Sequence, residues 1–116
     1  MNYNLEERTA VFSENLINFL RKNQKDVVTI PLVNQCLRAG TSIGANYMEA
    51  NGGSSKKDFK NKIYICKKEG KETTYWLRLI VKVIDKKELI DECKKLLQEA
   101  HELTLIFSKI AGSCSE

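Results

Sequence analysis

The feature that most constrains the fold is a proline-free segment, residues 56–84, in which apolar and small residues recur at alternating intervals of four and three. This spacing places the side chains on one face of an α-helix and is typical of helical bundles. Within it, Gly70 is the weakest point for a helix. We call this set the first seam; it comprises Phe59, Ile63, Cys66, Gly70, Thr73, Leu77, Ile80 and Ile84. The sequence therefore predicts a bundle built around this helix.

The same segment carries a second set of residues, about 110° round an ideal helix from the first. A helix in a four-helix monomer needs to bury only one wide face. A second set therefore favours a second packing partner, most simply another subunit. The alternative is that one wide apolar arc serves a single core. We call this set the second seam; it comprises Ile65, Glu69, Glu72, Trp76, Leu79 and Val83.

Three further helices are expected, because apolar residues recur at helical spacing between clear start and stop signals. Pro31 suits the first turn of a helix, the Gly52–Gly53 pair suits a helix end, and Gly112 is expected to end the last helix. The expected helices span about 5–25, 30–51, 56–84 and 86–111, with a disordered tail at 112–116. The predicted fold is all-α: a single domain, 1–116, forming an antiparallel up-down-up-down four-helix bundle.

Composition favours a soluble globular protein, with 42% hydrophobic and 29% charged residues. No apolar run is long enough to cross a membrane, and none at the N-terminus suggests a signal peptide. We therefore expect a cytoplasmic protein without membrane contact.

The cysteines, Cys36, Cys66, Cys93 and Cys114, are too widely spaced for a zinc knuckle or a redox pair. The first three lie on apolar faces and are expected in the core, whereas Cys114 is expected as a free, exposed thiol. No nucleophile–base pattern, phosphate loop or Glu-x-x-His motif of bundle metal sites is present. The sequence therefore predicts a protein that is not an enzyme and that uses no catalytic residue, metal or cofactor.

A line of polar residues borders the apolar face of the second helix, with intervals of four, four and three. It consists of Arg38, Ser42, Asn46 and Glu49. Polar groups at the edge of a core are usually hydrogen-bonded to one another, because desolvation without partners is costly. We expect Arg38 to pair with Glu72 of the second seam, and this pair to be extended by Ser42 and Asn46. The alternative is that the line forms a ligand or nucleic-acid site.

Residues 54–71 carry seven lysines against two carboxylates, so this stretch holds the whole positive excess of a chain of net charge +4. On an ideal helix, six cations fall within about 80° of one another and span about 39 Å: Lys56, Lys60, Lys67, Lys71, Arg78 and Lys82. Lys57, Lys68 and Tyr64 flank these six. Such a line can follow a phosphate backbone, although a solvated face that keeps the protein soluble is the commoner explanation. The cations, which we call the basic face, are Lys56, Lys57, Lys60, Lys67, Lys68, Lys71, Arg78 and Lys82.

Two segments resemble one bacterial family. The first signature of the family resembles Arg38 followed by Ser42-Ile43-Gly44-Ala45-Asn46-Tyr47-Met48-Glu49-Ala50. The second signature resembles Lys57-Asp58-Phe59, Ile65 to Glu69, Glu72 and Tyr75 to Leu79. The family comprises the four-helix-bundle proteins encoded within intervening sequences of large-subunit ribosomal RNA genes, often labelled S23 ribosomal protein. Ala50, Cys66 and Glu69 depart from the residues common there. The resemblance implies a ring-shaped homopentamer, with Arg38, Asn46, Glu49 and Glu72 as signature positions.

A related branch, the accessory protein of diversity-generating retroelements, binds nucleic acid and a reverse transcriptase through a basic surface. The resemblance therefore implies self-association, with RNA or DNA and a reverse transcriptase or another protein as partners. The hypothesis that follows is an oligomeric scaffold that binds structured RNA or DNA electrostatically through the basic face. The alternative is a structural or protein-interaction scaffold with no affinity for nucleic acid.

Overall fold

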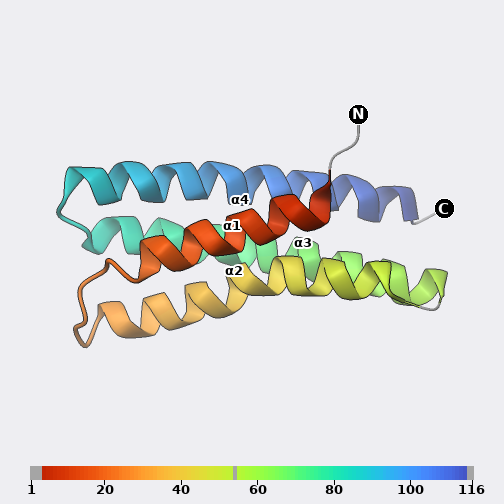
Figure 1. Cartoon of the computed structure of the whole chain (residues 1–116), viewed down its shortest axis with the longest axis horizontal. Coiled ribbons are helices and arrows are strands. Elements are labelled where there is room, and N and C mark those ends of the chain that lie inside the picture. The colour runs from red at the N-terminus through yellow and green to blue at the C-terminus, as the bar shows by residue number, and fades with distance from the viewer. Residues whose placement is uncertain (1–3, 54, 115–116) are drawn as a thin grey trace.

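The computed structural model describes residues 4–53 and 55–114, which form four α-helices, one short 3-10 helix and, within those ranges, no strand. The elements are α1 (Leu5–Leu20), α2 (Thr29–Asn51), α3 (Lys56–Ile80), η1 (Val81–Val83) and α4 (Lys87–Cys114). The helices lie side by side along the longest axis of a body measuring 46 × 29 × 19 Å, and their connections fall at alternate ends (Figure 1). The all-α prediction is confirmed.

The first seam of α3 lies in the core. Ile63, Cys66, Leu77 and Ile80 are completely buried, and Phe59 and Ile84 are half-buried at the two ends. Gly70 lies at a close approach of α3 to α4, because an added Cβ would be only 2.4 Å from the Thr104 hydroxyl oxygen. The glycine therefore offsets its poor helix propensity by allowing close packing.

The second seam is only partly covered within the single chain. Glu69 is buried, whereas Ile65, Glu72, Trp76, Leu79 and Val83 are half-buried. Trp76 packs against the edge of the core. One chain thus covers part of this second face and leaves the rest accessible to a further partner.

Ion pairs connect α1 to α4, which are far apart in sequence. Arg8, near the start of α1, pairs with Glu99 and Glu102 around the middle of α4, at 2.7 and 3.0 Å. Lys22, just after the end of α1, pairs with Glu92 near the start of α4 at 3.0 Å. The beginning of α1 therefore lies beside the middle of α4, and the end of α1 lies near the start of α4.

The first helix ends at Leu20, and the prediction that it continues to about Lys25 was wrong. The backbone N–H of Asn23 donates to the Leu20 carbonyl, and its side-chain amide donates to the Phe19 carbonyl, so this residue satisfies the end of α1. Three residues later, the Asp26 carboxylate accepts from the N–H groups of Val28 and Thr29 and thereby caps α2. The bond from the Thr29 N–H is also the main reason that the pKa of Asp26 is lowered.

The α-helical part of the third helix ends at Ile80, earlier than the predicted Ile84. Residues 81–84 contain three β-branched side chains, which favour α-helix less, and the backbone tightens into η1 before Ile84 becomes extended. The last helix, predicted to span 86–111, starts at Lys87 and continues through Gly112 to Cys114. Burial of Ala111 and the bond from the Ser113 hydroxyl to the Lys109 carbonyl support this last turn.

The predicted disordered tail is therefore wrong for residues 112–114, and residues 115–116 lie outside the described ranges. No helix within the described residues is long and apolar enough to cross a lipid bilayer.

Candidate nucleic-acid interface and the adjoining polar cluster

The basic face is carried almost entirely by α3. Lys60 and Lys67 are half-buried, and the other six cations are exposed. Within the described residues, none of the eight is within ion-pair distance of a carboxylate, whereas Lys62, which points away from this face, pairs with Glu49 at 2.6 Å. The cations of the basic face are therefore available to an anionic partner.

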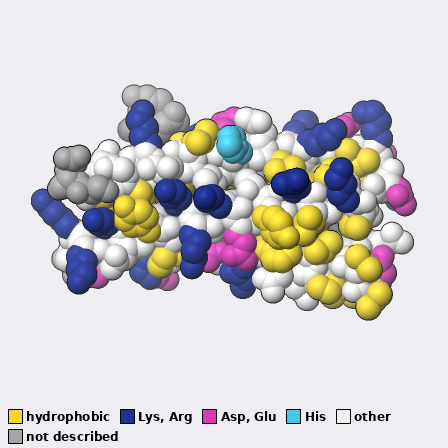
Figure 2. Space-filling model, turned by 180° about the vertical axis from the view of Figure 1, so that it is seen from behind, with side chains coloured by type: hydrophobic (Ala, Val, Ile, Leu, Met, Phe, Trp, Pro, Cys, Tyr) yellow, Lys and Arg dark blue, Asp and Glu magenta, His cyan; other side chains and the backbone are white. Residues whose placement is uncertain are grey.

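The shape of this surface suits an extended anion. From Lys56 to Arg78 the helix is continuous, which corresponds to about 33 Å at 1.5 Å per residue. Because α3 lies behind α1 in Figure 1, its outer side faces the viewer in Figure 2, where Lys and Arg side chains form a row along the molecule. Hydrophobic side chains gather beside part of this row, and acidic side chains lie at one point along it.

Lys82 is placed differently from the prediction. It lies in η1, where the chain makes a turn in about three residues instead of 3.6. Its direction around the helix therefore differs from the one predicted for an ideal α-helix. The straight part of the basic face ends at Arg78, and Lys82 extends it around the end of the helix.

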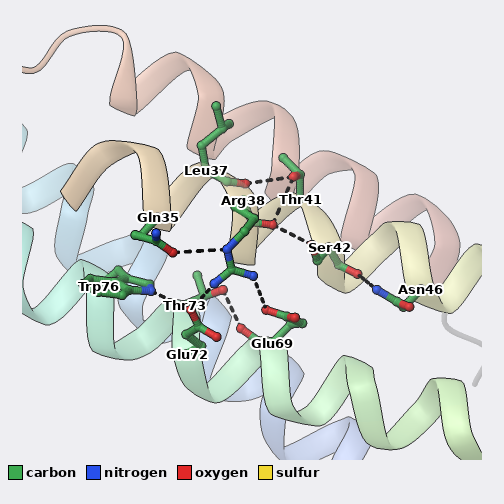
Figure 3. Close-up of polar contacts among 10 residues, drawn as sticks. All are labelled: Gln35, Leu37, Arg38, Thr41, Ser42, Asn46, Glu69, Glu72, Thr73 and Trp76. Atoms are coloured by element: carbon green, nitrogen blue, oxygen red, sulfur yellow. Dashed lines mark hydrogen bonds and ion pairs between the residues drawn. The ribbon is translucent and has the colours of Figure 1, made fainter. Parts of the chain in front are cut away.

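The second candidate site is an ion-pair cluster between α2 and α3, which we call the Arg38 cluster: Gln35, Arg38, Glu69, Glu72 and Trp76 (Figure 3). The Arg38 guanidinium contacts Glu72, as predicted, and its Nη1 lies 3.2 Å from a Glu69 carboxylate oxygen. The Gln35 amide oxygen accepts from Nε of Arg38 at 3.2 Å, and the Trp76 indole N–H donates to Glu72 at 3.0 Å. One arginine thus links two carboxylates of the second seam to α2.

The other members of the predicted polar line do not join this cluster. The Ser42 hydroxyl donates to the Arg38 carbonyl at 2.6 Å, and the Asn46 amide donates to the Ser42 carbonyl at 2.8 Å. Both bonds stay within α2, so the expected extension of the ion pair through these side chains was wrong. Glu49 is engaged by Lys62 instead, as described above. The reason is that residues four apart on a helix readily bond back to their own backbone.

The sequence did not identify Glu69, Gln35 or Trp76 as members of the cluster. Glu69 is the most informative omission, because its side chain is only 11% exposed and it needs a cation more than Glu72 does. Its position in the second seam, three residues before Glu72, was the available signal. Gln35 stands three residues before Arg38, which is also a neighbouring position on a helix.

Replacing Arg38 by alanine is expected to lower the free energy of unfolding by about 1–3 kcal/mol, because Glu69 would stay buried without its cation. The effect is smaller than for a fully buried pair, since 46% of the Arg38 side chain is exposed. Chemical denaturation measures it, with Arg21→Ala as an exposed control. Adding Glu69→Gln should recover part of the loss; strictly additive effects would contradict the pairing.

The buried cysteines are packing residues. Burial raises the pKa of the Cys36, Cys66 and Cys93 thiols to about 12. They therefore stay protonated, and two of them donate to carbonyls: Cys66 to Ile43 and Cys93 to Leu77, each at 3.4 Å. Their expected place in the core is confirmed. Cys114 is a free thiol, but it is half-buried at the end of α4 rather than exposed in a tail.

Comparison with known proteins gives matches to a family model and to solved structures. A family model described as 23S rRNA-intervening sequence protein matches residues 2–109. A crystal structure from Bacteroides thetaiotaomicron, described as a protein with unknown function from the S23 ribosomal protein family, is 33% identical. It covers 91% of this chain and 96% of its own, with a TM-score of 0.77. No curated protein matches. Both similarities include the helices that carry the basic face and the Arg38 cluster.

Proposed function

Because the chain belongs to the 23S rRNA-intervening sequence protein family, we propose that it is a non-enzymatic, oligomeric protein that binds structured RNA or DNA through its basic face. The family's description connects its members with an RNA element, and the related crystal structure is described as having unknown function. The proposal of binding is therefore based on the surface of this chain.

The observation that carries the proposal is the lack of carboxylate partners for the eight cations of the basic face within the described residues. Aligned cations repel one another, and a phosphate backbone relieves this repulsion while releasing its own condensed counterions. Elsewhere on the same helix the carboxylates Glu69 and Glu72 are engaged by Arg38, so they do not neutralise the basic face.

The proposed architecture is an antiparallel up-down-up-down bundle that assembles as a ring, a homopentamer. The contacts of Arg8 and Lys22 with α4 support the antiparallel arrangement. The half-exposed second seam of α3 supports a further packing partner. In a ring each basic face is repeated, so weak contacts to one long nucleic acid would add up through effective concentration.

The proposal is tested by fluorescence anisotropy of a labelled RNA hairpin and a matched DNA duplex across a salt series. If six to eight cations contact phosphates, log K should fall against log salt with a slope of about −4 to −7. Binding that does not change with salt, or no binding at about 50 mM salt, would contradict the proposal.

The alternative proposal is a protein-interaction scaffold without nucleic-acid affinity. The half-buried Trp76 and Leu79, with the exposed Tyr75 next to them, favour it, because such residues are enriched where proteins meet. In both proposals we expect the protein to be cytoplasmic. A reverse transcriptase or another protein would bind together with the nucleic acid in the first proposal, and in place of the nucleic acid in the second.

A further inference from the structure

Two tyrosines lie within the basic face of α3. Tyr64 is 41% exposed and Tyr75 is 52% exposed, and they are separated by eleven residues, or about three helical turns. They therefore point to the same side of the helix and are about 16 Å apart along its axis. This regular placement distinguishes them from apolar residues that are scattered singly over a surface.

Each tyrosine is flanked by cations on both sides along the helix. Residues three and four positions apart are neighbours on a helical surface. The cations at these positions are Lys60, Lys67 and Lys68 around Tyr64, and Lys71 and Arg78 around Tyr75. An aromatic ring between cations is the arrangement that proteins use to hold single-stranded nucleic acid, with stacking on bases and charge on phosphates.

The rings differ from the other tyrosine near the core. Tyr47 is half-buried and packs on Phe107, with ring centroids 5.4 Å apart. Tyr75 meets Trp76 edge to face at 5.1 Å and 67°, a contact that orients the ring yet leaves more than half of the residue in water. Tyr47 is thus largely covered by the core, whereas Tyr64 and Tyr75 keep a large exposed surface.

We infer that the basic face recognises unpaired nucleotides, with Tyr64 and Tyr75 stacking on two bases while the flanking cations contact the phosphates. This inference rests on the proposed function. In a duplex the faces of the bases are stacked on one another and only their edges reach the grooves, so the two rings would gain nothing there. Their separation of about 16 Å far exceeds the 3.4 Å per nucleotide of a stacked strand, so the two bases are several nucleotides apart.

The test compares an unstructured RNA of about 12 nucleotides with the same strand annealed to its complement. A Tyr64→Leu/Tyr75→Leu variant should bind the single strand more weakly, by on the order of 5- to 150-fold for each ring, and bind the duplex as the wild type does. The matched Tyr64→Phe/Tyr75→Phe variant keeps both rings and should retain affinity. The salt slope should be the same in all three proteins. The same sequence as DNA shows whether the 2′-hydroxyl contributes.

Each other outcome is decisive. If the wild type binds but the leucine variant binds both ligands unchanged, or loses both equally, the inference is overturned and the basic face still binds nucleic acid. If the wild type binds neither ligand at about 50 mM salt, the proposed function fails together with the inference. Should the leucine variant not fold, photocrosslinking of wild-type protein to a 5-bromouridine strand decides: adducts on Tyr64 or Tyr75 support the inference, and adducts only elsewhere overturn it.

Discussion

A Lys60→Glu/Lys67→Glu/Lys71→Glu variant is expected to lose RNA affinity by about 100- to 1000-fold at about 50 mM salt. Each phosphate contact contributes roughly tenfold to affinity at this salt concentration relative to 1 M, and three contacts would be replaced by repulsion. The slope of log K against log salt should also become less steep by about 2–3. Anisotropy titrations of the hairpin measure both quantities.

The control for this variant reverses the same number of lysines away from the basic face. Lys25, Lys95 and Lys109 are exposed and lie in the α1–α2 connection and on α4. Since each reversal changes the charge by two, both triple variants move the formal net charge from +4 to −2. The control should therefore bind much more tightly than the basic-face variant. Equal losses in the two proteins would show that only total charge matters, and the basic face would not be a site.

The second large effect is on stability. A Phe107→Ala variant should lose about 3–5 kcal/mol of unfolding free energy, because the ring is completely buried and its removal leaves a cavity in a close-packed core. The ring also contacts Tyr47, so its loss removes an aromatic contact between α4 and α2. The melting temperature should fall by on the order of 10–25 °C, as measured by circular dichroism.

Leu105→Ala is the matched control, since it removes an apolar side chain two residues away on the same helix. Leu105 is 56% exposed, so its truncation should change stability by no more than about 0.5 kcal/mol. Comparable destabilisation by the two substitutions would mean that the solvent-facing side of α4 is buried in the folded protein in solution, and would point to an assembly that covers it.

Sequence periodicity predicted which side of α3 is buried, but it did not predict every contact between helices. The spacing of four and three correctly placed Ile63, Cys66 and Leu77 in the core, because burial on one helical face is a property of position along the chain. The Arg38–Glu72 pair was also predicted, since a carboxylate within an apolar seam requires a cation. The second carboxylate, Glu69, was not assigned, because the distance from Arg38 depends on how α2 and α3 are rotated against each other.

Helix ends were predicted less well, for a local reason. Asn23 and Asp26 each have side chains that bond either to their own segment or to the next helix, and the sequence does not show which they choose. Gly112 was interpreted as a stop, but glycine costs a helix only about 1 kcal/mol, which the burial of Ala111 next to it offsets. Local side-chain bonds therefore decided where α1 ended, whereas burial of Ala111 against the core supported the continuation of α4.

The sequence by itself determined the helical class, the approximate positions of four helices, the buried side of α3 and the cations of the basic face. All of these depend on residue type and on spacing within one helix. Only the tertiary structure showed that Glu69 shares Arg38, that Ser42 and Asn46 bond within their own helix, and that Tyr64 and Tyr75 remain open to solvent between the cations. These facts depend on the relative rotation and separation of helices, which side-chain packing fixes only when the whole core is assembled.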